Sequence, residues 1–123
     1  MDSELLAALN NAAPISIRRN PLKIESELPI DKGIDWCDNA FYLSERPLFT
    51  LDPLFHAGSY YPQEAGSMVI DSVLRQLDLP NDLVVLDLCG APGGKSTLVL
   101  SFFNNSGLLV SNEVIQSRAR ILK

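Results

Sequence analysis

The stretch that decides the fold of this 123-residue chain reads Val84-Val85-Leu86-Asp87-Leu88-Cys89-Gly90-Ala91-Pro92-Gly93-Gly94-Lys95-Ser96-Thr97. Residues 83–88 form a short apolar run, rich in β-branched residues, that follows turn-forming residues at 80–82. This run predicts a buried strand covered on both faces. Residues 95–103 predict a helix. A strand that leads into a helix through a glycine-rich loop is a place where α/β proteins bind cofactors.

The glycines of the loop indicate a sharp bend or a close approach of a ligand to the backbone. Gly90, Gly93 and Gly94 remove side chains at these points, and Pro92 stiffens a segment that would otherwise be flexible. The start of the following helix adds backbone amide donors and partial positive charge. The loop therefore predicts a binding site.

Two common nucleotide motifs do not fit the spacing of this loop. A P-loop requires a glycine at the position of Cys89, although Gly94, Lys95 and Ser96 match the end of that motif. The dinucleotide fingerprint G-x-G-x-x-G requires a glycine where Pro92 stands. The sequence therefore disfavours a nucleotide triphosphatase and a dinucleotide-dependent enzyme.

A third interpretation is an S-adenosylmethionine site, in which a carboxylate follows the second strand. Residues 108–112 predict that strand after a turn at 104–107, and Glu113 comes directly after it. A carboxylate there can accept hydrogen bonds from both ribose hydroxyls. Glu113 can equally be an N-cap or a first-turn acid of a helix over 114–122. The residues alone leave both roles open.

The loop resembles motif I of the Sun/nucleolar-protein family of RNA cytosine-C5 methyltransferases. Two further segments extend the resemblance over nearly the whole chain. Residues 55–68 resemble the Tyr-x-Gln-Glu-x-x-Ser-Met segment of the family, and residues 16–23 resemble its Ser-x-Arg-x-Asn-x-x-Lys element. Residues 36–47 are most similar to the bacterial branch that acts on 16S ribosomal RNA. The resemblance implies a ribosomal RNA substrate.

The resemblance also implies roles for individual residues. Glu113 would bind the ribose of S-adenosylmethionine, and Arg18 would contact RNA. The remaining cofactor contacts would come from motif I, chiefly through backbone groups: Cys89, Gly90, Ala91, Pro92, Gly93, Gly94 and Lys95. Lys95 can instead be a solvated first-turn residue. Asp87 can help to hold the cofactor's ammonium group or can accept hydrogen bonds from loop amides.

Methylation at C5 of cytosine requires a cysteine thiolate that adds to C6. The family carries this cysteine downstream of the second strand, and neither Cys37 nor Cys89 lies in such a context. We therefore expect no catalytic residue here, and we interpret the chain as the N-terminal part of a larger enzyme, inactive alone and with a half-built cofactor site. The alternative is a natively short, non-catalytic RNA-binding or assembly module with a relic cofactor loop.

Other reactive or aromatic residues have structural interpretations. For Cys89 we favour a packing role as a small side chain. The alternative is a thiol that is easily oxidised, because a position near the start of a helix can make a thiol more reactive. His56 has no visible partner and is expected to be structural. Tyr60 and Tyr61 can stack on a base, but packing beside a helix is the commoner role.

The predicted fold class is α/β: the start of a Rossmann-like S-adenosylmethionine-dependent methyltransferase sheet, preceded by a small α+β module. We expect the module and its connector at 1–58 and the incomplete methyltransferase domain at 59–123. Within them the sequence predicts a helix over 3–11, a strand over 15–19, a strand or hairpin over 34–43 and an amphipathic helix over 66–77. The apolar stripe of that last helix is expected in the core: Val69, Ile70, Val73, Leu74 and Leu77.

The charge of the chain is an objection to RNA binding. The formal net charge is −5, and no long basic run is present, whereas phosphate binding requires clustered Lys and Arg. The nearest cluster is Arg18, Arg19 and Lys23, and these arginines can instead balance Glu25 and Glu27 on a solvated face. Two distant cysteines and the lack of metal-ligand spacing, signal peptide or long apolar stretch predict a cytoplasmic protein without metal or membrane contact. The oligomeric state is not indicated.

Overall fold

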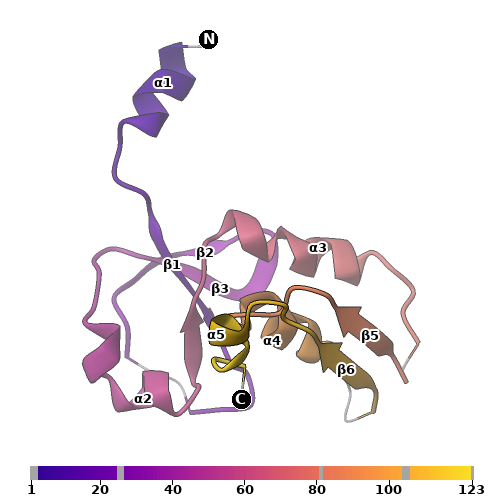
Figure 1. The fold of residues 1–123 in the computed structure, drawn as a ribbon. Helices are drawn as coiled ribbons and strands as arrows, with labels where there is room; N and C mark the ends of the chain where they lie inside the picture. Colours follow the sequence, from indigo (N-terminus) through magenta and orange to yellow (C-terminus); the bar gives the residue numbers. More distant parts are fainter. Residues whose placement is uncertain (1–2, 25–26, 81, 104–105, 123) are drawn as a thin grey trace.

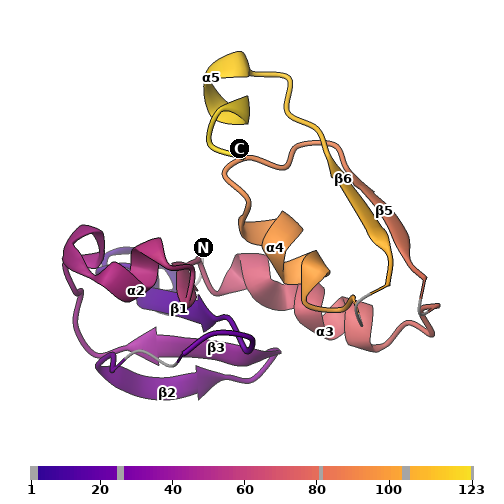
Figure 2. The same ribbon diagram turned by 90° about the horizontal axis from the view of Figure 1, so that it is seen from below.

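A computed structural model gives the fold, and it describes residues 3–24, 27–80, 82–103 and 106–122. The N-terminal half forms a four-stranded sheet, and the C-terminal half forms a two-stranded sheet, with two helices between them (Figures 1 and 2). The first helix, α1 (Ser3–Leu9), extends away from the rest of the molecule (Figure 1). Its start agrees with the predicted helix over 3–11.

The four-stranded sheet has the order β2-β3-β1-β4, and all neighbouring strands are antiparallel. Its strands are β1 (Ile15–Arg19), β2 (Ile30–Ile34), β3 (Cys37–Leu43) and β4 (Tyr60–Pro62). The strand or hairpin predicted over 34–43 is the strand β3, and its hairpin partner β2 lies at 30–34, before most of the predicted range. The short strand β4 was not predicted, because three residues in a connector carry no alternation pattern.

The two faces of this sheet bury different clusters, because successive side chains of a strand point to opposite sides. On one face Ile17, Leu43 and Tyr60 pack with the 3-10 turn Phe49–Leu51 and with α2 (Pro53–His56). On the other face, the buried residues of β2 and β3 are Ile34, Cys37 and Ala40. They pack with three residues of the helical part of the chain: Ala65, Met68 and Leu98. The β1 side chains Ser16 and Arg18 are also buried.

The C-terminal half has the parallel arrangement expected of an α/β fold. β5 (Val84–Asp87) pairs in parallel with β6 (Leu108–Ser111), and α4 (Gly94–Leu100) connects them on one side. A short helix, α5 (Gln116–Ala119), follows β6. The predicted class, the start of a Rossmann-like sheet after a small α+β module, is confirmed.

The helix predicted over 66–77 consists of a 3-10 turn, Gly66–Met68, followed by α3 (Val69–Arg75). Ile70 and Leu74 pack against the core, as expected. Val69, Val73 and Leu77 are about half exposed, so the prediction that the whole stripe is core is wrong. The physical reason is that α3 contacts the four-stranded sheet and α4 with a narrower face than the stripe occupies.

The strand predicted over 83–88 is present, but one of its two faces is open. Val84 is 73% exposed and Leu86 is 59% exposed. The expectation of cover on both faces is therefore wrong for the described residues, since α4 packs on one side only. The domain boundary between residues 58 and 59 stays a prediction. Strand β4 comes after that boundary and pairs with β1 of the N-terminal sheet as far as Pro62.

Candidate functional site

The loop between β5 and α4 is held in place by a network of short hydrogen bonds. Asp87 accepts from the backbone N–H of Cys89 at 3.1 Å and from the Ser96 hydroxyl at 2.6 Å. The Gly90 N–H donates to the Asn112 carbonyl at 2.8 Å, which ties the loop to the end of β6. Asp87 thus accepts a loop amide, one of the two roles that the sequence left open.

Glycine is required in this loop for two separate reasons. Gly93 has a φ of 111°, a left-handed conformation that other residues rarely adopt. Gly94 has ordinary backbone angles, but a Cβ there would lie 3.1 Å from the Tyr61 ring. A Cβ at Gly90 would lie 3.1 Å from the side chains of Ser96 and Ser111. The loop therefore packs closely against its neighbours through its backbone.

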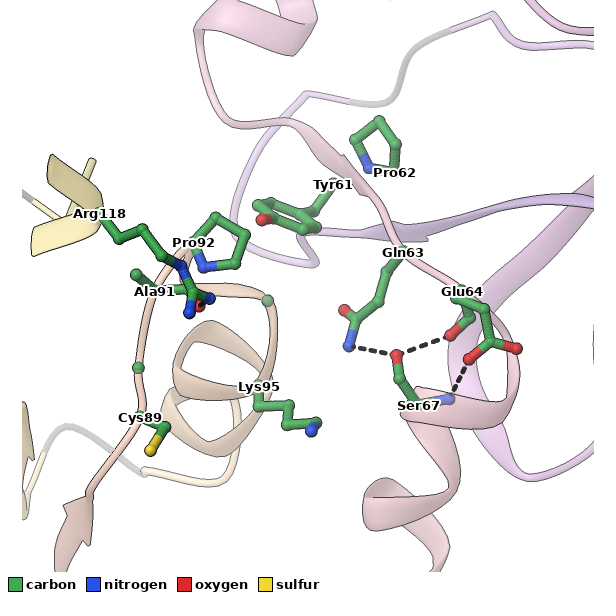
Figure 3. Close-up of a pocket in the computed structure, with 12 residues that line it drawn as sticks. Tyr61, Pro62, Gln63, Glu64, Ser67, Cys89, Ala91, Pro92, Lys95 and Arg118 are labelled. Carbon is green, nitrogen blue, oxygen red and sulfur yellow. Dashed lines mark hydrogen bonds between the residues drawn. The ribbon is translucent and has the colours of Figure 1, made fainter. Parts of the chain in front are cut away.

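A cavity of about 410 Å³ lies between this loop and the segment that follows β4; we refer to it as the loop cavity. Its lining comes from three parts of the chain (Figure 3). The loop contributes Cys89, Gly90, Ala91, Pro92, Gly94 and Lys95; the opposite wall contributes Tyr61, Pro62, Gln63, Glu64 and Ser67; and α5 contributes Arg118. A volume of this size is typical of a small-molecule site.

The opposite wall of the loop cavity was not identified as a site from the sequence. Glu64 accepts hydrogen bonds from the backbone N–H groups of Gly66 and Ser67, both at 2.7 Å, so its carboxylate is occupied locally. Burial raises the pKa of the Tyr61 phenol, and the nearby Arg18 charge partly offsets this. The Tyr-x-Gln-Glu resemblance was the signal that could have placed this wall in the site.

The sequence-predicted residues Cys89 to Lys95 come together at the loop cavity, except that Gly93 does not line it. Cys89 is exposed, so the packing role favoured for its side chain is wrong. The loop turns outward after β5, which leaves its thiol on the cavity surface (Figure 3). His56 contacts the Thr50 carbonyl at 2.9 Å, in keeping with a structural role.

Glu113 lies outside the lining of the loop cavity, behind Arg118. Its side chain is 2% exposed, and one oxygen accepts from the Ile115 N–H at 3.0 Å. The other oxygen lies 3.6 Å from Arg118 Nη1 and has no hydrogen-bond donor. Arg118 also donates to the Ala91 carbonyl. The carboxylate is therefore paired with Arg118, and ribose binding by Glu113 stays a prediction.

Arg18 is 7% exposed and joins the two halves of the molecule. Its guanidinium donates to the Gln63 side-chain oxygen at 3.2 Å, to the Gly94 carbonyl at 3.2 Å and to the Thr97 hydroxyl at 2.6 Å. Burial lowers the Arg18 pKa. The solvated-face alternative is wrong for Arg18, because β1 points this side chain towards α4; Glu25 lies outside the described residues. RNA contact by Arg18 stays a prediction without support from this geometry.

Comparison with known proteins identifies the family. The model of the N-terminal domain of the 16S rRNA methyltransferase RsmF matches residues 2–65. This chain belongs to the RsmF family. Relatives named ribosomal RNA small subunit methyltransferase F are 37% identical in Shewanella halifaxensis and 35% identical in Vibrio parahaemolyticus, each over 97% of this chain. The chain spans 29% and 27% of their lengths. The resemblance to the bacterial 16S branch of the Sun family is confirmed.

Solved structures agree with the RsmF assignment. A methyltransferase homologue from Pyrococcus horikoshii matches 93% of this chain with a TM-score of 0.73 and 28% identity, and the match covers 40% of that protein. The structure of PH0851 matches 94% of this chain with a TM-score of 0.77 and 26% identity, over 28% of its own length. The Rossmann-like interpretation of β5, α4 and β6 is therefore supported by proteins of known structure.

Within the described ranges, no group of three or more His, Cys, Asp and Glu side chains is arranged to hold a metal ion. No helix in the part of the chain that the structure describes is long and apolar enough to cross a bilayer.

Proposed function

We propose that this chain supplies the methyl-donor loop of an S-adenosylmethionine-dependent RNA cytosine-C5 methyltransferase that acts on 16S ribosomal RNA. The observation that carries the proposal is the loop cavity, in which a glycine-rich loop after a parallel strand faces the opposite wall, which we refer to as the Gln63 wall. The names of the RsmF relatives support a ribosomal RNA substrate. In this proposal, residues 1–58 form the N-terminal module with its connector, and residues 59–123 form the incomplete methyltransferase domain.

The residues present fit the methyl donor. The backbone from Cys89 to Lys95, with the exception of Gly93, borders the cavity, and Cβ atoms at Gly90 or Gly94 would crowd the neighbouring side chains. The buried oxygen of Glu113 lacks a donor, and a ribose hydroxyl is a donor of the required kind. When bound, S-adenosylmethionine supplies an electrophilic methyl group. Glu113 would hold its ribose, and the loop backbone would hold its amino-acid end.

The proposal assigns no nucleophile to the cysteines of this chain. Cys37 is buried in the core between the four-stranded sheet and the helices, and burial raises the pKa of its thiol to about 11. Cys89 belongs to the cofactor loop. We therefore propose that the chain by itself binds the methyl donor weakly and does not methylate RNA.

Replacement of Gly93 by valine tests the loop assignment. A Cβ at Gly93 would meet only Leu122, at 3.7 Å, so steric intrusion is not the cause of the expected effect. The cause is backbone strain, since a β-branched residue at a φ of 111° costs about 1–3 kcal/mol and moves the loop. We expect Gly93→Val to abolish binding of S-adenosylhomocysteine, followed in an NMR titration by the amide signals of Gly90 and Gly94.

The matched control is Gly33→Val. Gly33 lies in β2 with a strand conformation, and a Cβ there meets no atom within 4 Å, so binding should be unchanged. Binding of S-adenosylhomocysteine by Gly93→Val with the wild-type affinity would refute the loop assignment. Micromolar binding by the wild-type chain would refute the expectation of a half-built site.

A further inference from the structure

The side-chain amide of Gln63 has a fixed orientation at the wall of the loop cavity. Gln63 follows β4 and is 8% exposed. Arg18 Nε lies 3.2 Å from the amide, and an arginine nitrogen can only donate. The atom of Gln63 that faces Arg18 must therefore be the oxygen, which places the NH₂ group on the opposite side.

The NH₂ group of Gln63 has only one of its two hydrogens in use. It donates to the Ser67 hydroxyl at 3.2 Å, and that hydroxyl donates its own hydrogen to the Glu64 carbonyl at 2.7 Å (Figure 3). The described residues offer no acceptor for the second N–H. Gln63 lines the loop cavity, so a donor of a residue that is only 8% exposed, with no acceptor among the described residues, borders the space where a ligand would lie.

The charges around the cavity favour an occupant rich in acceptor oxygens. Lys95 contributes positive charge to the lining, whereas the charge of Arg118 is paired with Glu113 at 3.6 Å. The carboxylate of Glu64 is bonded to the backbone of Gly66 and Ser67. A fixed N–H donor in a cavity that also contains a lysine is complementary to a carboxylate or a polarised carbonyl.

We propose that Gln63 is a specificity-determining residue that donates its free N–H to an acceptor oxygen of the ligand in the loop cavity. The inference rests on the proposed function. That oxygen belongs either to the carboxylate of the methyl donor or to the C2 carbonyl of the target pyrimidine, and separate titrations distinguish the two.

Gln63→Glu separates the donor role from a structural one. The substitution keeps the size of the side chain and an acceptor for Arg18, but it removes both N–H donors. We expect thermal stability to be unchanged or higher, because the new carboxylate pairs with the Arg18 guanidinium. Affinity should fall roughly tenfold or more for the ligand that Gln63 contacts, since a buried acceptor is left facing another acceptor.

The measurement is a pair of NMR titrations of the 123-residue chain, with S-adenosylhomocysteine and with cytidine 5′-monophosphate. In the wild type, the side-chain N–H signals of Gln63 should shift with the ligand that it contacts. The matched control is Gln76→Glu, which adds the same charge at the end of α3; Gln76 is exposed and bonds to Ser72. Its affinities should equal those of the wild type.

A selective loss with S-adenosylhomocysteine supports contact with the donor's carboxylate, and a selective loss with cytidine 5′-monophosphate supports contact with the base. Wild-type affinity of Gln63→Glu for both ligands overturns the inference while the proposed function stands. An equal loss in Gln76→Glu also overturns it, because added charge alone then explains the effect. If the wild-type chain binds neither ligand, the proposed function is refuted, and the inference about Gln63, which rests on it, is refuted as well.

Discussion

The two cysteines show how residue environment sets chemistry in this chain. Cys37 lies in β3, buried against Met68 and Leu98, and burial is the main reason that its pKa rises to about 11, with the Asp71 charge adding to the effect. Cys89 is exposed beside the loop cavity. A thiol reacts as its thiolate, so Cys37 is inert at neutral pH in the folded chain.

The raised pKa of Cys37 predicts a loss of stability in alkali. The folded state holds the thiol proton more tightly than the unfolded chain, whose thiol pKa is near the ordinary value of 9.0. This contribution is present below pH 9 and is lost as the pH rises to about 11, by roughly 1–2 kcal/mol. Urea denaturation across this range should show the decline. Cys37→Ala should reduce the decline, leaving the part due to the Tyr60 phenol, whose pKa burial also raises, and Cys89→Ala should not change it; equal slopes in all three proteins would contradict the prediction.

At the scale of elements, Arg18 is the main polar link between β1 and α4. Its three hydrogen bonds reach Gln63, Gly94 and Thr97, which are separated from it by 45 to 79 positions in the sequence. The N-terminal sheet therefore holds the helix that follows the glycine-rich loop. This link explains why the loop and the Gln63 wall face each other across the cavity.

Arg18→Met should weaken this link. The change leaves the buried Gln63 oxygen without a donor and removes the Arg18 hydrogen bonds to the Gly94 carbonyl and the Thr97 hydroxyl, which still bond to each other. We expect a loss of roughly 2–3 kcal/mol in the free energy of unfolding. Hydrogen exchange should accelerate in α4. The control Arg46→Met removes an exposed cation that lies 5.9 Å from the Phe49 ring and should cost less than about 1 kcal/mol. Equal losses in both variants would rule out a joining role for Arg18.

At the scale of the whole molecule, one face of the two-stranded sheet is an exposed apolar surface. Val84 pairs with Leu108 and Leu86 with Val110, and paired residues of a parallel sheet share a face. All four side chains are about half exposed or more. The opposite face, with Val85 and Leu109, lies towards α4 (Figure 2). Contiguous apolar surface of this kind marks an interface or a tendency to associate.

This surface should bind a hydrophobic dye. We expect the wild-type chain to enhance anilinonaphthalene sulfonate fluorescence and Leu86→Lys to reduce that enhancement, with a change of less than about 1 kcal/mol in the free energy of unfolding, because the side chain is already exposed. Leu51→Lys, at a position 75% exposed on the far side of the four-stranded sheet, is the control. A loss of several kcal/mol in Leu86→Lys would mean that the face is covered in solution.

The sequence predicts most of the local elements but only part of the candidate site. The glycine loop and the strands on either side of it follow from apolar runs and turn residues close together in the chain. The Gln63 wall and Arg118 were missed, because only the Tyr-x-Gln-Glu resemblance pointed to the wall and no local pattern marks Arg118 as facing the loop. The burial of Val69, Val73 and Leu77 was overestimated, since a helical stripe indicates an apolar face but not how much of it is covered.

By itself the sequence determined the strand, loop and helix from Val84 to Leu100 and the family resemblance, because these depend on spacing, turn chemistry and the conformational freedom of glycine within a few residues. Only the tertiary structure decided that Arg18 is buried between the two halves, that Gln63 lines the loop cavity and that one Glu113 oxygen has an ion pair with Arg118 but no hydrogen-bond donor. These features arise from contacts between segments far apart in the chain, which no local pattern encodes.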